Sequence, residues 1–242
     1  MNSSDMDEVL FHPELQERYE ASVKCGPCEH ARWPRACWGA SNGWLLLVGP
    51  SPGKAEEGEV QTDKRDCLPV YIGKDAGKIN FAPEVRNRRR NLMWNRFTST
   101  IFAAAAAKRP VITKAEEYAY ALTSVANLDW QNSTKEADIE RSRLENGCPI
   151  VWNVIEASRP RIVVALTNSV WDVFGPTVAK HKYGSFFYDG PSVRMPFLFK
   201  ITSQSAPSLF FKSPRHPSYP LSSAHREQIG QIVTRFMELP QN

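Results

Sequence analysis

The chain has 242 residues, of which 42% are hydrophobic and 23% charged, and its formal net charge is +4. This composition is typical of an ordinary soluble globular protein, and the modest positive charge permits nucleic-acid binding without requiring it. No apolar run approaches the ~20 residues that span a bilayer, and the N-terminus lacks the pattern of a signal peptide. With no internal repeat or linker, we expect one cytoplasmic domain over residues 1–242 that does not bind a membrane.

The first half of the chain alternates expected helices and strands. Residues 1 to about 24 carry apolar side chains near a 3.6-residue period, which predicts an N-terminal helical arm. Residues 44–48 are an apolar run that predicts a buried strand, ended abruptly by a turn of two prolines and two glycines. A helix is expected over residues 84–107, with four arginines between positions 86 and 90. A second strand is expected over residues 119–126, ending in Asn127.

The second half continues the alternation. A capping-box pattern at Ser133 begins a helix that ends at Arg159-Pro160. A strand is expected over residues 161–166, where a continuous apolar run follows Arg161, as in a parallel strand covered on both faces. The remaining expected elements are a short helix over 168–174, a strand over 197–201, a rigid loop over 213–220 and a closing helix over 222–239. This order predicts an α/β fold: a three-layer α/β/α sandwich around a central, mostly parallel four-stranded sheet.

The turn after residues 44–48 lies where open α/β sheets bind their ligands, at the carboxyl end of a strand. Pro50 and Pro52 fix the backbone and lack N–H groups, and Gly53 allows close approach of a ligand. Glu56 and Glu57 follow directly. The pattern predicts a ligand-binding loop, although a plain strand-to-helix turn would have the same residues.

Three loops stand at expected strand ends: Gly49-Pro50-Ser51-Pro52-Gly53, Asn127 and His216-Pro217-Ser218. In this order they resemble the uracil-DNA glycosylase superfamily across residues 25–239. The resemblance implies that Gly49, Pro52 and Gly53 form one wall of a base pocket. It also implies that Asn127 reads the base edge, and that the His216 loop supplies a histidine and inserts into the duplex.

The iron–sulfur subgroup of these glycosylases resembles the chain most. It has a Cys-x-x-Cys about twenty residues before the glycine loop, as Cys25 and Cys28 are here. The segment Val70-Tyr71-Ile72-Gly73-Lys74-Asp75-Ala76-Gly77 is similar to one in which an aromatic side chain stacks on the flipped base, which implies that role for Tyr71. Cys148-Pro149 and the helix and strand that follow match the subgroup's fourth cysteine and its surroundings.

The five cysteines, an odd number, argue against a disulfide framework and for a metal or redox site at the Cys-x-x-Cys. No cysteine stands near Gln131, where the subgroup has its third. A structural 4Fe–4S cluster on Cys25, Cys28 and Cys148 would therefore need Cys37 or Cys67. A zinc ion on the Cys-x-x-Cys, completed by Cys37 with His30 or Cys148, is the alternative. Neither is required for base excision.

Base excision requires several groups besides the pocket. A base must leave the stack before its glycosidic bond can be reached, so phosphates must be gripped and the gap filled. His216 would stabilise negative charge on the departing base, and a carboxylate would direct water or stabilise the sugar cation. Glu57 and Glu56 rank before Asp63 and Asp66 for this role, and Ser51 could position water. The residues expected to contact DNA are Arg215, Ser218, Tyr219, Leu221, Arg88 and Arg89, with Tyr219 and Leu221 as wedge candidates.

These residues predict a monomeric DNA glycosylase that flips a uracil or a bulkier modified pyrimidine from DNA and hydrolyses its N-glycosidic bond. Ser51 stands where the strongest uracil-cleaving relatives carry aspartate, so a silent DNA-binding relative that recognises damaged or abasic DNA is the alternative. Structural roles are also open: His216 as a surface residue, Tyr71 as core, the two glutamates as helix N-terminal charges, and Cys148 as a small buried apolar residue.

Overall fold

At the centre of the fold is a sheet whose middle strands are parallel. The computed structural model describes residues 37–39, 44–51, 85–108, 123–129, 139–186, 188, 190 and 194–239. Strands β3, β2, β4 and β7 lie side by side in that order and are mutually parallel. Three further strands extend this core by antiparallel pairing: β1 pairs with β3, β6 pairs with β7, and β5 pairs with β6. The strands are β1 (Cys37–Gly39), β2 (Leu45–Gly49), β3 (Thr123–Asn127), β4 (Ile162–Ala165), β5 (Lys182–Ser185), β6 (Phe197–Phe199) and β7 (Ser208–Lys212).

The α/β class is confirmed, but the expected four-stranded sheet is wrong: within the described residues the sheet has seven strands and is mixed. The strand expected over residues 197–201 is β6, which is antiparallel to β7. The fourth parallel strand is instead β7, which the sequence reading missed. Its apolar run, Leu209-Phe210-Phe211, is short and is flanked by turn residues, so its local pattern is weak.

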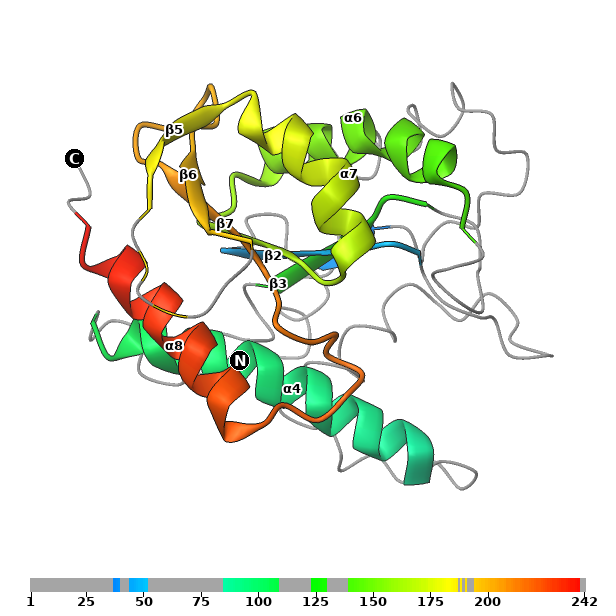
Figure 1. Ribbon diagram of the computed structural model, residues 1–242, viewed down its shortest axis with the longest axis vertical. Helices are drawn as coiled ribbons and strands as arrows, with labels where there is room; N and C mark the ends of the chain where they lie inside the picture. The colour runs from blue at the N-terminus through cyan, green and yellow to red at the C-terminus, as the bar shows by residue number, and fades with distance from the viewer. Residues whose placement is uncertain are drawn as a thin grey trace, which may run out of the picture.

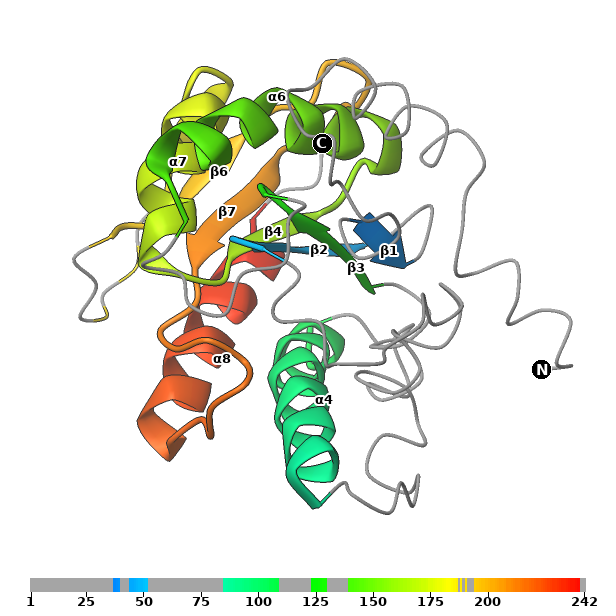
Figure 2. The ribbon, with the colours of Figure 1, turned by 90° about the vertical axis from the view of Figure 1, so that its right-hand side faces the viewer.

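Helices cover both faces of the sheet (Figures 1 and 2). Alternate side chains of β2 enter different cores because successive strand residues point to opposite faces. Leu45 and Leu47 pack in the cluster with α4 and α8, whereas Leu46 and Val48 pack in the cluster with α6 and α7. The helices are α4 (Val85–Ala106), α6 (Arg141–Ser158), α7 (Asn168–Ala179) and α8 (Ser223–Met237). The described residues therefore form three layers.

Two helix boundaries differ from expectation. α6 begins at Arg141 with Glu140 as its N-cap, and residues 139–140 are not helical, so the expected continuous helix from Ser133 is wrong. α7 continues past the expected residue 174 to Ala179 with Pro176 inside the helix. Burial of Val178 on α7 accounts for this, since apolar packing outweighs the poor helix propensity of Gly175-Pro176.

The closing helix α8 matches its sequence pattern. Ser222 is the N-cap, and its hydroxyl accepts a hydrogen bond from the backbone N–H of His225, 3.1 Å away. The expected apolar stripe is fully or almost fully buried and consists of Ile229, Ile232, Val233 and Phe236. This helix packs beside α4.

An aromatic cluster fixes β7 against α7. The ring of Phe210 on β7 stacks on that of Trp171 with their centroids 4.9 Å apart. The ring centroids of Phe174 and Phe197 lie 6.2 and 5.3 Å from that of Phe210. Phe210 is completely buried. Rigid packing of this kind sets the direction in which β7 leaves the sheet, and therefore the position of the loop that carries His216.

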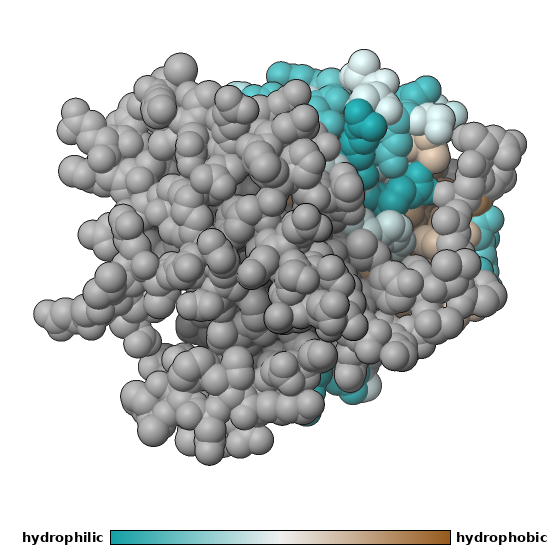
Figure 3. All heavy atoms as spheres, turned by 180° about the vertical axis from the view of Figure 1, so that it is seen from behind, coloured by the Kyte–Doolittle hydropathy of each residue, from teal (hydrophilic) through white to brown (hydrophobic). Residues whose placement is uncertain are grey.

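None of the helices in the described ranges is long and apolar enough to cross a membrane. Viewed from behind, the coloured part of the surface is mostly hydrophilic, with a smaller hydrophobic area (Figure 3). The expected N-terminal arm, residues 1 to about 24, lies outside the described residues, and the single domain stays a prediction.

The end of α6 supplies a stability prediction. Arg159, its C-cap, has φ 50° and ψ 52°, a left-handed conformation, and its N–H donates to the Ile155 carbonyl. Because this conformation costs a residue with a Cβ about 1–2 kcal/mol, we expect Arg159→Gly to stabilise the protein by about 0.5–1 kcal/mol in urea unfolding. Lys180, the C-cap of α7, has φ −59°, so Lys180→Gly should give no gain. Equal effects of the two substitutions would contradict the prediction.

Candidate functional site

The carboxyl ends of the four parallel strands form one continuous edge. Backbone hydrogen bonds join neighbouring strands at this edge: Leu128 N to Gly49 O at 3.0 Å, Leu166 N to Val48 O at 2.9 Å, and Ser213 N to Ala165 O at 2.9 Å. Adjacent strands lie about 4.8 Å apart, so β3 and β7 are separated by roughly 14 Å along the edge. The segments that follow β2, β3 and β7 therefore all begin at the carboxyl-terminal edge of the parallel strands.

Asn127 and Gly49 face one another at this edge. They are register partners on β3 and β2. Asn127 is 3% exposed, and a Cβ added at Gly49 would overlap its Oδ1 atom. Gly49 was expected to form part of one wall of a base pocket, and in the structure the absence of a side chain at Gly49 also makes room for the Asn127 amide. The amide is thus held at the sheet edge by close packing.

A partly buried ion pair forms two residues after Asn127. Asp129 is two residues further along the chain, its N–H donates to Pro50 O at 2.8 Å, and its side chain is 4% exposed. Its carboxylate pairs with the Arg143 guanidinium on α6. The sequence analysis named neither residue. The acidic residue two positions after Asn127 was visible, but nothing in the sequence indicates that Arg143 would reach it.

His216 lies in a tight turn after β7. The carbonyl of His216 accepts the Tyr219 N–H at 3.0 Å, and Pro217 occupies the second position of this turn, as is common. The Nδ1 atom of His216 accepts the Ser218 N–H at 3.1 Å. An accepting Nδ1 carries no proton, so the proton of the neutral ring is assigned to Nε2. The turn therefore sets both the tautomer and the direction of the imidazole.

The other expected DNA contacts in this loop lie close together. The Arg215 guanidinium lies over the Tyr219 ring, 5.1 Å from its centroid, and Tyr219 is 55% exposed. Leu221, the second wedge candidate, is instead partly buried against the core beneath α4 and α8, and its carbonyl accepts from Arg226 at 3.0 Å. Of the two wedge candidates, only Tyr219 projects a largely exposed side chain.

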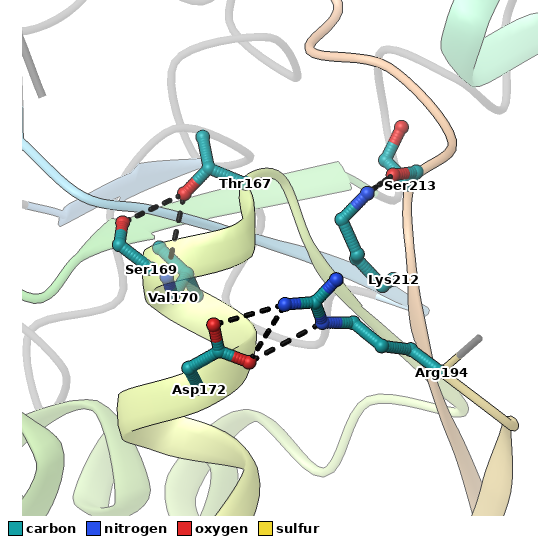
Figure 4. Close-up of polar contacts among 7 residues, drawn as sticks. All are labelled: Thr167, Ser169, Val170, Asp172, Arg194, Lys212 and Ser213. Carbon is teal, nitrogen blue, oxygen red and sulfur yellow. Dashed lines mark hydrogen bonds and ion pairs between the residues drawn. The ribbon is translucent and has the colours of Figure 1, made fainter.

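Polar groups that the sequence reading did not single out surround the start of α7 (Figure 4). The Thr167 hydroxyl accepts the Val170 N–H at 3.3 Å and lies 3.1 Å from the Ser169 hydroxyl. Arg194 binds both carboxylate oxygens of Asp172 at 2.9–3.2 Å, which ties the segment before β6 to α7. Lys212 Nζ donates to Ser213 O at 2.8 Å.

The remaining expected site residues are placed only in part. Ser51 is half-buried just beyond β2. Arg88 and Arg89 lie on α4, in a part of the helix for which the structure describes the backbone only. The catalytic and base-binding candidates outside the described residues are Glu56, Glu57, Pro52, Gly53 and Tyr71.

Cys148, an expected metal ligand, lies between α6 and α7 and is 5% exposed. Its thiol is within hydrogen-bonding distance of two carbonyl oxygens, those of Leu144 at 3.4 Å and Val173 at 3.7 Å. Burial raises the pKa of this thiol to about 11. Cys37 lies on β1 without a described side chain, and Cys25 and Cys28 lie outside the described residues. Among residues whose placement is described, no group of three or more His, Cys, Asp or Glu could hold a metal ion.

The environment of Cys148 predicts its reactivity. Because the pKa is raised to about 11, the thiol stays protonated at pH 8 and should be labelled slowly by iodoacetamide in the folded protein. The folded state also holds this proton more tightly than the unfolded state, so this group's contribution to stability should fall as the pH rises from about 9 towards 11. Peptide mapping by mass spectrometry, before and after denaturation, measures the labelling. Rapid labelling of the native protein would contradict the prediction.

The fold and this edge define an α/β protein with polar side chains gathered at the carboxyl ends of parallel strands. A scan against protein-family models finds no match to the chain, and a search of curated proteins finds no significant match.

Proposed function

We propose that the protein is a DNA glycosylase that flips a uracil or another modified pyrimidine from DNA and hydrolyses its N-glycosidic bond. The observation that carries the proposal is the common edge on which β2 ends before Ser51, β3 ends in Asn127, and β7 leads into the His216 turn. These are the three loops on which the resemblance to uracil-DNA glycosylases rests. The three-layer arrangement is compatible with that fold, which we propose for this chain.

Asn127 is proposed to read the edge of the flipped base. Its amide offers both a donor and an acceptor, so it can pair with a pyrimidine that presents the complementary groups. Because Asn127 is 3% exposed, a base with the wrong pattern would form a mismatched polar contact that water reaches poorly, which is costly. Burial of the amide therefore favours selectivity.

His216 is proposed to stabilise the departing base. Bond cleavage leaves negative charge on the base, and a hydrogen bond to its oxygen lowers the barrier when the donor is already oriented. With Nδ1 accepting the Ser218 N–H, the Nε2–H group is the donor that the ring can present. No proton needs to move to His216 before the reaction.

Glu57, and after it Glu56, is proposed to direct water to the sugar or to stabilise its positive charge, with Ser51 assisting. Arg215, Ser218 and Tyr219 are proposed to contact the DNA backbone and fill the gap left by the base, while Arg88 and Arg89 add phosphate contacts. A 4Fe–4S cluster or zinc ion on Cys25, Cys28, Cys148 and Cys37 would be structural.

A panel of defined DNAs tests the proposal. The protein is incubated with single- and double-stranded oligonucleotides that contain uracil, other deaminated bases or modified cytosines, and abasic sites are detected by alkaline cleavage. We expect release from at least one substrate and loss of release in Glu57→Gln. Folded protein that releases no base from any of them overturns the proposal. Binding to abasic DNA without release, unchanged in Glu57→Gln, would instead identify the silent DNA-binding relative that Ser51 suggests.

A further inference from the structure

The segment after β3 is clamped from two directions. On one side, the β2–β3 pairing continues beyond the strands, because Leu128 N donates to Gly49 O and Asp129 N to Pro50 O, at 3.0 and 2.8 Å. The backbone that carries Asn127 is therefore coupled to the backbone of Gly49 and Pro50. This leaves the other side of the segment to be held by a different element.

That element is α6, which approaches the segment at two positions one turn apart. At Gly147 the approach is so close that an added Cβ would overlap the Leu128 carbonyl. Arg143, four residues earlier and thus on the same face of the helix, pairs with the Asp129 carboxylate. The Asp129 side chain is 4% exposed and that of Arg143 is 30% exposed, so the pair is largely shielded from water. A shielded pair holds its geometry better than a surface pair, because water and salt screen it less.

We propose that Arg143 and Asp129 are positioning residues for Asn127. They anchor α6 to the two residues that follow Asn127 and so hold its amide in the orientation that reads the base; this inference rests on the proposed glycosylase function. Neither residue contacts the base. Loss of the pair releases the segment on the α6 side only, since the backbone bonds to β2 remain.

The test is a double-mutant cycle with Asn127→Ala. Arg143→Gln alone should lower the single-turnover rate of base release about 10- to 100-fold, the scale expected for a misplaced catalytic contact, with a change in KM below about threefold. In the Asn127→Ala background the same substitution should change the rate less than about twofold, because the amide that it positions is gone. Equal effects in both backgrounds would overturn the inference.

Arg141→Gln is the matched control. Arg141 lies on the same helix and pairs with Glu145 at 2.7 Å, but the two side chains are 70% and 54% exposed. We expect no effect of this substitution on rate or selectivity. If Arg143→Gln fails to fold, Arg143→Lys retains the charge with a shorter, single donor and should give a smaller loss of rate in the same cycle.

A spectroscopic measurement separates this inference from the proposed function. The side-chain amide of Asn127 is observed by NMR, and its resonances are assigned by their loss in Asn127→Ala. We expect these resonances to shift in Arg143→Gln and not in Arg141→Gln. This outcome is independent of any DNA substrate, so a protein without glycosylase activity would overturn the proposed function while the positioning is still measured. Unchanged resonances in Arg143→Gln would overturn the positioning.

Discussion

His216→Ala is expected to lower the rate of base release about 100- to 1,000-fold while the protein stays folded, the range found when one preorganised donor to a developing anion is removed. The physical reason is the orientation of the ring. Its Nδ1 accepts the Ser218 N–H at 3.1 Å, so the turn directs the protonated Nε2 without further rearrangement. The measurement is a single-turnover assay on the best substrate of the DNA panel.

His225→Ala is the matched control. His225 lies nine residues further on, and its Nδ1 likewise accepts a backbone N–H, that of Ser222 at 3.4 Å, in the capping box of α8. Its loss should cost about 1 kcal/mol of stability, as for other helix caps, and should leave the rate unchanged. A rate in His216→Ala equal to that of the unaltered protein would show that the histidine has no part in base release.

Gly49→Ala is expected to abolish most activity with only a modest loss of stability. The new methyl group would overlap Oδ1 of Asn127, and the backbone at Gly49 is held by its pairing with β3. The flexible end of the Asn127 side chain is therefore the part that moves. A displacement of about 1 Å at a catalytic contact can cost about 100-fold in rate, whereas we expect unfolding free energy to fall by no more than about 2 kcal/mol.

Two further variants make this expectation specific. Gly230 on α8 has no atom within 4 Å of an added Cβ, so Gly230→Ala should retain full activity and gain about 0.5–1 kcal/mol of stability. The double variant Gly49→Ala/Asn127→Ala removes the overlap, and it should recover stability without recovering activity. A Gly49→Ala protein with full activity would show that the amide does not need the position seen here.

The two central strands β2 and β4 could be predicted from the sequence because burial on both faces of a sheet requires a run of apolar residues. Residues 162–166 and 44–48 are continuous apolar runs, and β4 and β2 lie within them, buried on both faces. The weak strands escaped detection for a different reason. β1 and β5 lie at the two edges of the sheet and have only three and four residues, which is too short for a recognisable apolar pattern.

Strand direction could not be read locally. The segments of β6 and β7 both contain phenylalanine and leucine, yet β6 is antiparallel and β7 belongs to the parallel core. Direction depends on which strands pair, and pairing joins residues far apart in the chain. The same limit hid the Arg143–Asp129 pair, whose partners come from different elements.

The sequence by itself determined the α/β class, the two most buried strands, the closing helix α8 with its apolar stripe, and the residue types at the strand ends on which the proposed function rests. These follow from local patterns of apolar runs, apolar periodicity and turns. Tertiary structure alone decided the seven-stranded mixed sheet, the use of Gly49 as space for the Asn127 amide, the orientation of His216 by its own turn, and the burial of Cys148 between two helices. Each of these depends on packing and hydrogen bonds between distant segments, which no local pattern records.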